Sequence, residues 1–179
     1  MIILIGPSAS GKTEVARELV KRGRFKKLVT YTTRNKRIKE VEGVDYHFIT
    51  KEEFFDKINK GLFFEYVEYN SNFYGTLKED ITDDKVVILE PKGFKNYYEA
   101  KLNNVISFFL ASDEEHRIDR MIFRRDDEEK IKERIASDRI VFNLSNIDGI
   151  DYIIDSDSLT ISQITDEVED LYFNRINKS

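Results

Sequence analysis

Near the start of the chain, glycines, a lysine and a hydroxyl group follow one another in a spacing that suits the binding of a phosphate chain. The run from Gly6 to Thr13, GPSASGKT, fits the pattern G-x-x-x-x-G-K-[ST] at every position. Glycines allow the backbone N–H groups of such a loop to point inward at a phosphate. Lys12 can reach the β- and γ-phosphates of a nucleoside triphosphate, and the hydroxyl of Thr13 can bind Mg²⁺. The residues expected around the triphosphate are Gly6, Pro7, Ser8, Ala9, Ser10, Gly11, Lys12 and Thr13.

The segments on either side of this loop read as a strand and a helix, which is the context that the motif requires. Ile2–Ile5 is a short apolar run typical of a buried strand, and Glu14–Arg22 reads as a helix that ends at Gly23. The helix adds the positive end of its dipole to the phosphate site.

Apolar runs alternate with helical patterns along much of the chain, which predicts an α/β fold with a parallel sheet. The further expected strands are Leu28–Tyr31, Val86–Leu89, Val105–Leu110 and Tyr152–Ile154. Their β-branched residues without strict alternation are typical of strands covered on both faces. Further helices are expected from about Ser112 to Arg125, from about Asp126 onward, and at the C-terminal end. Ligands of such sheets bind at the carboxyl ends of the strands, where the loop lies.

Residues 32–84 interrupt this alternation, because they are rich in Tyr and Phe and contain short alternating pieces. We expect them to form a small mixed α+β insertion with one helix near Lys51–Asn59. The charged block 113–139 is expected to form a helical lid. The predicted organisation is a P-loop-type core with a parallel five-stranded sheet (1–31, 85–112 and 140–179), an inserted subdomain (32–84) and the lid.

Composition narrows the possible classes of function. The chain has 179 residues, no cysteine and a formal net charge of −5. A disulfide framework or cysteine-bound metal is therefore impossible, and nonspecific nucleic-acid binding is disfavoured. No basic n-region or cleavage site of a signal peptide is evident, and no apolar run approaches the roughly 20 residues that cross a bilayer. We expect a cytoplasmic protein, a monomer or a homodimer, whose partners are small-molecule nucleotides and not nucleic acid or membrane.

A second group of residues could hold a nucleotide that carries a single phosphate. Its motifs are T-T-R-N-K-R at 32–37, G-V-D-Y-H-F at 43–48, Glu65, and N-F-Y-G-T at 72–76. The forks of Arg34 and Arg37 match phosphate oxygens bidentately, and the hydroxyls of Tyr46 and Tyr74 could add donors. The carboxylate of Glu65 only accepts hydrogen bonds, and guanine offers adjacent N1–H and N2–H₂ donors where adenine does not.

In this order and at this spacing, the motifs resemble the guanylate kinase pattern of T-T-R-x-x-R, G-x-D-Y-x-F, F-x-E and N-x-Y-G-[TS]. With the phosphate loop, the resemblance covers nearly the whole chain. It implies a transferase that uses Mg²⁺ and moves the γ-phosphoryl group of ATP to GMP or dGMP. The GMP-binding residues that it implies are Thr30, Arg34, Arg37, Tyr46, Glu65, Tyr74, Thr76 and Glu90. The residues that it implies for the transfer itself are Lys12, Arg34, Arg120, Arg124 and Arg134.

The implied reaction needs no general base, because the acceptor phosphate is already largely ionised near neutral pH. Catalysis would depend on positioning and on charge stabilisation during in-line transfer. Arg120, Arg124 and Arg134 are expected to approach the ATP phosphates when the lid closes. The alternative for these arginines is a salt-bridged helix surface, since the acidic run 126–129 lies alongside. The two histidines, His47 and His116, are expected to be structural or exposed.

Three segments depart from the guanylate kinase pattern. A D-x-D-x-x-G stretch is expected after the third core strand, but the shorter segment at 89–93, L-E-P-K-G, keeps only the acid Glu90. The lid has R-R-D-D at 124–127 where a glycine-rich turn is expected. The Asn expected after the last strand is replaced by Asp155 or Ser156.

Other functions remain open on the sequence alone. The chain could phosphorylate another (deoxy)nucleoside monophosphate or a ribose bisphosphate, although Glu65 and Thr76 argue against an acceptor without a base. It could be a non-catalytic guanylate-kinase-like module that binds proteins, although such modules typically lose the phosphate loop. A P-loop regulatory switch would leave the second group of motifs without a role.

Overall fold

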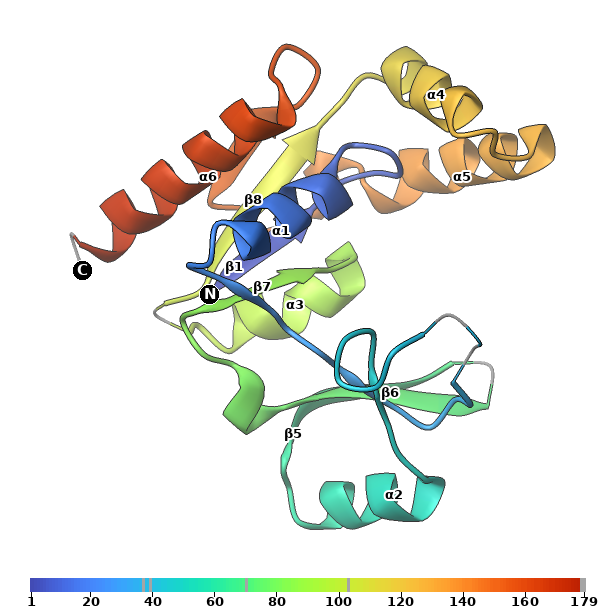
Figure 1. Cartoon of the computed structure of the whole chain (residues 1–179), viewed down its shortest axis with the longest axis vertical. Helices are drawn as coiled ribbons and strands as arrows, with labels where there is room; N and C mark the ends of the chain where they lie inside the picture. The colour runs from blue at the N-terminus through green and yellow to red at the C-terminus, as the bar shows by residue number, and fades with distance from the viewer. Residues whose placement is uncertain (37, 39, 70, 103, 178–179) are drawn as a thin grey trace. The chain divides into compact units, whose positions relative to one another are not determined.

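The computed structural model describes residues 1–36, 38, 40–69, 71–102 and 104–177, and the chain divides into two compact units (Figure 1). The first unit comprises Met1–Lys26 and Val86–Ser179, and the second unit comprises Lys27–Lys85. No helix among the described residues is long and apolar enough to cross a membrane.

A five-stranded sheet in the order β2-β7-β1-β8-β9 forms the centre of the first unit. The strands are β1 (Ile2–Ile5), β2 (Lys26–Lys27), β7 (Lys85–Ile88), β8 (Ile106–Ala111) and β9 (Tyr152–Asp155). β1 runs parallel to β7 and to β8, with Ile3 opposite Val87 and Ser107, and β9 runs parallel to β8. The carboxyl ends of these strands therefore meet at one edge of the sheet, where ligands of such folds bind.

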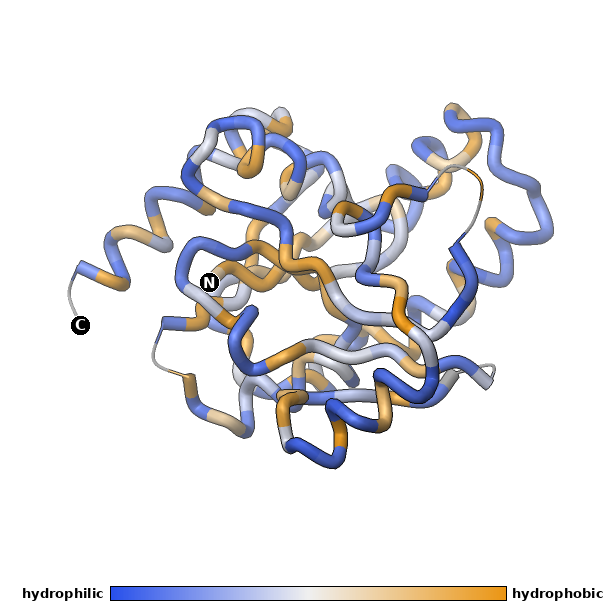
Figure 2. Tube along the Cα trace, turned by 60° about the horizontal axis from the view of Figure 1, so that its bottom comes forward, coloured by the Kyte–Doolittle hydropathy of each residue, from blue (hydrophilic) through white to orange (hydrophobic). Residues whose placement is uncertain are grey.

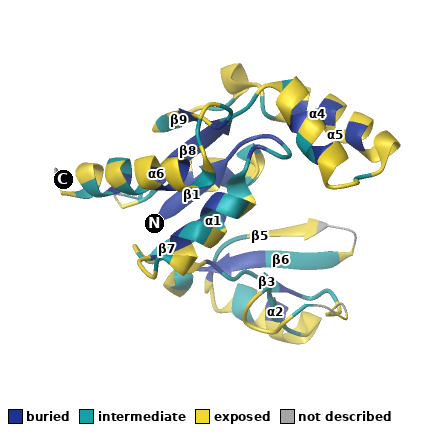
Figure 3. Ribbon diagram, turned by 45° about the horizontal axis from the view of Figure 1, so that its top comes forward, coloured by how far each residue is buried: buried dark blue, intermediate teal, exposed yellow. Residues whose placement is uncertain are grey.

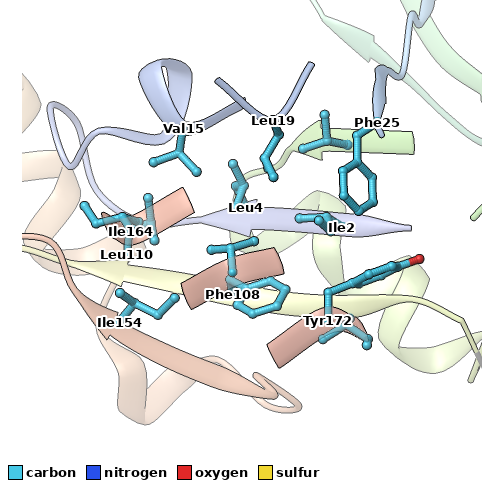
Figure 4. Close-up of a cluster of buried hydrophobic side chains, with 13 residues drawn as sticks. Ile2, Leu4, Val15, Leu19, Phe25, Phe108, Leu110, Ile154, Ile164 and Tyr172 are labelled. Carbon is cyan, nitrogen blue, oxygen red and sulfur yellow. The ribbon is translucent and has the colours of Figure 1, made fainter. Parts of the chain in front are cut away.

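The helices of the first unit flank this sheet. They are α1 (Lys12–Lys21), α3 (Pro91–Glu99), α4 (Glu114–Phe123), α5 (Glu128–Val141) and α6 (Ile161–Ile176), with a 3₁₀ turn η2 (Leu144–Asn146). α1 and α6 cover one face, where Leu19 and Val168 belong to the same buried cluster as Leu4 and Phe108 (Figure 4). Hydrophobic and hydrophilic residues alternate along α6 (Figure 2), as expected of a helix with one buried face.

Strand β1 is fully buried on both faces, and Figure 3 shows the same burial along β8. Ile2 and Leu4 face the cluster formed with α1 and α6, and the alternating side chains between them point to the opposite face. Helix α3 contacts β1 as well. The continuous apolar composition of β1 is the consequence of this cover on both sides.

The second unit has its own four-stranded sheet in the order β4-β3-β6-β5. Its elements are β3 (Tyr31–Thr32), β4 (His47–Phe48), α2 (Lys51–Asn59), β5 (Phe63–Tyr69), β6 (Asn72–Leu77) and a 3₁₀ turn η1 (Lys78–Asp80). β6 runs antiparallel to β3 and β5, whereas β4 runs parallel to β3. Phe54 of α2 stacks on Phe63 at 4.3 Å between ring centroids and forms a small core with Leu77.

The α/β fold with a parallel five-stranded sheet flanked by helices is confirmed. The strand Ile2–Ile5 and the helix Lys51–Asn59 have the predicted bounds, and the last three predicted core strands are shifted only at their ends. α4 and α5 begin later than predicted, because Asp113 and Asp127 are N-cap residues with extended backbone.

The predicted core strand Leu28–Tyr31 is wrong. Lys26–Lys27 joins the sheet of the first unit, Tyr31–Thr32 joins the sheet of the second unit, and residues 28–30 connect the two strands. Leu28 is only 3 % exposed, so an apolar residue of a connection gives the same sequence signal as a strand residue. The sequence patterns also do not predict α3, which follows Glu90 directly and carries its apolar residues among polar ones.

Candidate functional site

The loop between β1 and α1 is closed by its own hydrogen bonds. Ser10 donates its backbone N–H to the carbonyl oxygen of Pro7 at 3.3 Å, and Lys12 Nζ donates to the same oxygen at 2.6 Å. A Cβ on Gly6 would lie 2.6 Å from the carbonyl oxygen of Leu110, and the φ of Gly6 is +148°, so only glycine fits. Gly11 has φ +94° and is the N-cap of α1. The first turn of that helix therefore presents its unsatisfied N–H groups at the loop.

The ammonium of Lys12 is partly desolvated. Burial lowers the pKa of Lys12 to about 8, the charge of Asp138 opposes this shift and the charge of Arg117 adds to it. The weaker influence of Glu14 and Glu90 also favours the charged form. A cation in this environment, at the N-terminus of a helix, makes a strong electrostatic site for a polyphosphate.

Thr13 and Glu90 each provide side-chain oxygen in the first unit that could bind a metal ion. The side chain of Thr13 makes no hydrogen bond to any residue in the described part of the chain, and Thr13 is exposed in the first turn of α1. Glu90 is the N-cap of α3, but its side chain forms no capping hydrogen bond. Both oxygens are of the hard type that Mg²⁺ prefers.

Arg120 of α4 joins three segments at the carboxyl edge of the sheet. It donates to the carbonyl oxygen of Ala9 in the loop at 3.1 Å and to Ser112 Oγ after β8 at 3.2 Å. After β9, it donates to the carbonyl oxygen of Ser156 at 3.2 Å and to Asp157 Oδ1 at 2.8 Å. Arg120 therefore contacts the phosphate loop directly.

The other predicted lid arginines make different contacts. Arg124 pairs with Glu14 of α1 at 2.9 Å, and Arg134 pairs with Asp126 at 2.9 Å on the surface. Neither contact is with the loop Gly6–Gly11. In this structure both side chains take part in ion pairs, which matches the salt-bridged surface that the sequence left open for them.

A cavity of about 440 Å³ lies beside Arg120. Its lining comes from the segments that follow β8 and β9 and from the start of α4: Ala111, Ser112, Asp113, His116, Asp155, Asp157 and Ser158. Asp157 accepts hydrogen bonds from Ser112 Oγ and from the backbone N–H of Asp113, and His116 Nδ1 lies 3.2 Å from Asp157 Oδ2. The cavity has room for a nucleobase, and three of its lining residues, Asp113, Asp155 and Asp157, carry carboxylates that can accept hydrogen bonds.

Sequence reasoning missed Asp138 and Arg117, which form a buried ion pair at the loop. Asp138 Oδ2 accepts from the backbone N–H of Ser8 at 2.8 Å and from Arg117 NH1 at 2.8 Å. A signal was available, because Ile131, Ile135 and Asp138 recur at helical spacing and are all buried in α5. An acid on the apolar face of a helix requires a partner.

In the second unit, the structure brings Arg34, Tyr46 and Tyr74 together. The guanidinium carbon of Arg34 lies 5.5 Å from the ring centroid of Tyr46, and the rings of Tyr46 and Tyr74 are 6.0 Å apart. Arg34 donates from both terminal nitrogens to the two carboxylate oxygens of Glu40, at 3.0 and 2.7 Å. The guanidinium group of Arg34 is therefore oriented so that it binds a planar anion through two hydrogen bonds. Arg37, which the sequence placed in the same group, lies outside the described residues.

Glu65 and Thr76 face each other on neighbouring strands. They are paired in the ladder between β5 and β6, and Thr76 Oγ1 donates to Glu65 Oε1 at 2.8 Å. Burial raises the pKa of Glu65, and the hydrogen bond from Thr76 opposes the rise. Thr30 directly precedes β3 in the same unit, and its carbonyl oxygen accepts from the backbone N–H of His47 at 2.9 Å.

Comparison with known proteins identifies similar chains over this whole length. The family model described as guanylate kinase matches residues 1–173. Guanylate kinase from Clostridioides difficile is 33 % identical over 186 residues, covering 99 % of this chain and 89 % of that protein. Guanylate kinase from Bartonella henselae is 30 % identical over 170 residues, covering 90 % and 76 % respectively. The crystal structure of guanylate kinase from Anaplasma phagocytophilum superposes with a TM-score of 0.65 at 26 % identity, covering 96 % of this chain and 82 % of that one.

Proposed function

The chain belongs to the guanylate kinase family, which phosphorylates GMP to GDP, and we propose that it takes the phosphoryl group from ATP and prefers GMP to other acceptors. The chain is accordingly a nucleoside monophosphate kinase. The pairing of Glu65 with Thr76, in the unit that also holds Arg34 and both tyrosines, is the observation that carries the preference for GMP.

The first unit binds ATP in this proposal. The loop Gly6–Thr13 surrounds the phosphates with backbone N–H groups, and Lys12 neutralises charge where the β- and γ-phosphates meet. Arg120 adds a second cation, because it already contacts the loop at Ala9. The cavity beside Arg120 takes the adenine, whose exocyclic amino group is a donor that the acceptors of Asp155 and Asp157 suit.

The residues present fit Mg²⁺. Thr13 would hold the ion through its hydroxyl. The carboxylate of Glu90, which follows β7 and is the N-cap of α3, would act near the ion through a water molecule. When bound, Mg²⁺ neutralises charge on the transferring phosphoryl group. The chain's own part is to orient the triphosphate and to keep Lys12 beside it.

Residues 32–84 serve as the GMP-binding subdomain in this proposal. Arg34, together with Arg37, binds the phosphate of the acceptor through charge-assisted hydrogen bonds, and Tyr46 and Tyr74 add hydroxyl donors. Glu65 accepts from the N1–H and N2–H₂ groups of guanine. The single hydroxyl hydrogen of Thr76 either orients Glu65, as in this structure, or is donated to O6 or N7 of guanine. Thr30 takes the position at which the family usually has a serine near the base.

Transfer then requires no proton acceptor among the side chains. The acceptor phosphate is a dianion for the most part near neutral pH, and in-line attack is promoted by positioning and by positive charge. Lys12, Arg34 and Arg120 supply that charge. Arg124 and Arg134 are further candidates if the lid, 113–139, rearranges when nucleotides bind.

A coupled ADP-release assay tests this function with ATP, Mg²⁺ and a panel of acceptors: GMP, dGMP, AMP, CMP, UMP and ribose bisphosphate. The highest kcat/KM is expected with GMP or dGMP. Faster turnover of another acceptor would show that the substrate assignment is wrong. If no acceptor in the panel supports ADP release, the chain is a non-catalytic member of its family.

A further inference from the structure

Asp138 connects helix α5 to the phosphate loop. Its carboxylate is 7 % exposed and accepts from Ser8 twice, from the backbone N–H at 2.8 Å and from Oγ at 3.3 Å. It also accepts from Arg117 of α4 at 2.8 Å, and Arg117 is 5 % exposed. One buried carboxylate of α5 thus binds two other segments of the first unit, the phosphate loop and α4.

Packing alone does not explain a charge at this position. Ile131 and Ile135 of α5 already form an apolar cluster with Met121 of α4, and Ala9 of the loop packs against it. An apolar residue at position 138 would extend that cluster without the cost of desolvating an ion pair. Nε of Arg117 is buried with no hydrogen-bond partner in the described part of the chain, so the pair is not fully compensated. An apolar residue, however, could not accept the N–H of Ser8.

The part of the loop that Asp138 holds has an unusual backbone conformation. Ala9 has φ +61°, a left-handed value that costs free energy for a residue with a Cβ. The backbone N–H of the neighbouring Ser8 donates to Asp138, and the carbonyl oxygen of Ala9 itself accepts from Arg120. Such a conformation persists only where the surroundings impose it. The contacts from α4 and α5 therefore determine the shape of the loop just before the residues that face the phosphates.

We propose that Asp138 is a positioning residue of the ATP site, which holds the outer turn of the phosphate loop, Ser8 and Ala9, in the conformation that binds ATP. Arg117 pairs with the carboxylate of Asp138 and orients it toward Ser8. The inference rests on the proposed function, because it takes ATP to be the ligand of this loop. Asp138 does not touch the nucleotide, since a carboxylate repels phosphate. It acts through the backbone of the loop.

If Asp138 has this role, replacing it should weaken the binding of ATP and ADP and leave the binding of GMP nearly unchanged. Asp138→Ala removes the acceptor of the Ser8 N–H, and we expect the KM for ATP and the Kd of Mg·ADP to rise about tenfold, the scale of one lost hydrogen bond to a charged group. The KM for GMP should change less than twofold, because Arg34, Glu65 and Thr76 belong to the second unit. Asp138→Asn keeps an acceptor oxygen and should give an intermediate defect.

A matched control is available in the same two helices. Glu114 of α4 pairs with Arg139 of α5 through two contacts, at 2.8 and 2.6 Å, and does not contact the loop. Glu114→Gln breaks an exposed ion pair that joins the same two helices, α4 and α5. It should leave the KM for ATP and the Kd of Mg·ADP within twofold of the wild-type values.

A double variant separates positioning from stability. Asp138→Leu with Arg117→Met replaces the buried pair by apolar residues, a change that is often neutral or stabilising in other proteins. We expect this variant to have a thermal midpoint close to that of the wild type and yet to bind Mg·ADP about tenfold more weakly. Calorimetric titration of Mg·ADP, steady-state kinetics with each nucleotide varied, and thermal unfolding are the measurements.

The outcomes distinguish a failure of the proposed function from a failure of the role assigned to Asp138. If the wild type neither binds Mg·ADP nor uses ATP, the proposed function fails. If the wild type does both, and the folded double variant binds Mg·ADP with wild-type affinity, Asp138 is only a structural residue and the inference is overturned. A rise in both KM values by the same factor, in any of the folded Asp138 variants, would overturn it as well.

Discussion

At the scale of single residues, the fork of Arg34 is the clearest case of a side chain arranged for an anion. Glu40 binds it bidentately, and the rings of Tyr46 and Phe48 lie within 5.7 Å of its guanidinium carbon. A carboxylate and a phosphate present similar pairs of oxygens to such a fork. In the proposed function, an acceptor phosphate at Arg34 would share or replace the contact with Glu40.

Arg34→Lys should weaken every monophosphate acceptor alike. Lysine keeps the charge but cannot form the bidentate contact, and it stacks less well on the neighbouring rings. We expect kcat/KM for GMP and for AMP to fall by a similar factor, about tenfold or more, with the ratio between them unchanged. Kinetics with both acceptors measure this. A selective loss with GMP would mean that Arg34 contributes to recognition of the base.

Glu65→Gln should change the choice of base. The substitution replaces one acceptor oxygen by a donor that faces the donors of guanine. We expect it to weaken GMP by about 1–3 kcal/mol if the contact is bidentate, and to narrow the preference for GMP over AMP. The ratio of kcat/KM values reports the effect without interference from changes in enzyme concentration. An unchanged ratio would mean that Glu65 does not read the base and would point to Glu90 as the reader.

The pKa of Glu65 leads to a prediction about pH. Burial raises this pKa above its ordinary value, so the carboxyl group is protonated at a higher pH than an ordinary glutamate, and only the ionised form accepts both guanine donors. GMP affinity should fall as the pH decreases through this pKa. The GMP phosphate also titrates, near pH 6, but it does so equally for the Glu65→Gln variant.

The affinity ratio between wild type and Glu65→Gln isolates the carboxyl group. It should be largest near pH 7, and it should begin to fall at a higher pH than it would for a carboxyl group with the ordinary glutamate pKa of about 4.3. Binding of GMP measured by calorimetric titration at several pH values gives the ratio. If it stayed constant until the pH reached the range in which an ordinary glutamate titrates, about pH 4.3, Glu65 would not be the group that reads guanine in its ionised form.

At the scale of elements, the strand pair β5–β6 positions both Glu65 and Thr76, and Gly75 allows the strands to approach. A Cβ at this position would lie 2.8 Å from two ring atoms of Phe63 and 2.9 Å from the carbonyl oxygen of Glu65. The stack of Phe63 on Phe54 limits the movement of that ring. Because position 75 has no Cβ, Phe63 can stack on Phe54 while the backbone of Glu65 keeps its place beside it.

Gly75→Ala should destabilise the protein by about 1–3 kcal/mol, as overpacking does elsewhere, and should raise the KM for GMP because the backbone of Glu65 is displaced. Gly93→Ala is a suitable control, since a Cβ there meets only Leu89 side-chain atoms at 3.7 Å or more and the residue lies in a helix. Denaturant unfolding and GMP kinetics test both variants. Equal behaviour of the two would refute the role given to Gly75.

At the scale of the whole molecule, the two compact units are joined by two crossings of the chain, at Lys26–Lys27 and at Lys85–Val86. Relative motion is the usual behaviour of units joined in this way. In the proposed reaction, closure around both nucleotides would exclude water from the transferring phosphoryl group.

Binding of both nucleotides should compact the protein. A non-hydrolysable ATP analogue with GMP is expected to reduce the radius of gyration in small-angle scattering and to increase hydrogen-exchange protection in 32–84 and 113–139. Each nucleotide alone should have a smaller effect. The absence of compaction together with unchanged protection in both segments would exclude closure as part of the reaction.

The sequence alone determined the features that depend on near neighbours. The loop Gly6–Thr13 could be predicted because its shape follows from glycines at positions of positive φ and from the strand and helix that flank it. The helix Lys51–Asn59 could be predicted because its capping box, Thr50 with Glu53, and its apolar spacing are local. The acceptor motifs were also visible, and the structure brings Glu65 and Thr76, and Arg34 and Tyr46, into contact.

Only the tertiary structure decided the contacts between distant segments. Asp138 reaches Ser8 across 130 residues, and Arg120 reaches Ala9 across 111 residues. The failure of the predicted strand Leu28–Tyr31 is of the same kind, because residues 28–30 connect a strand of one sheet to a strand of the other, and a strand's partners are chosen by packing and not by its own composition. Local sequence shows which residues can bind phosphate or accept from guanine, but the conformation at Ser8 and Ala9 also depends on contacts with α4 and α5, which are more than 100 residues away in the chain.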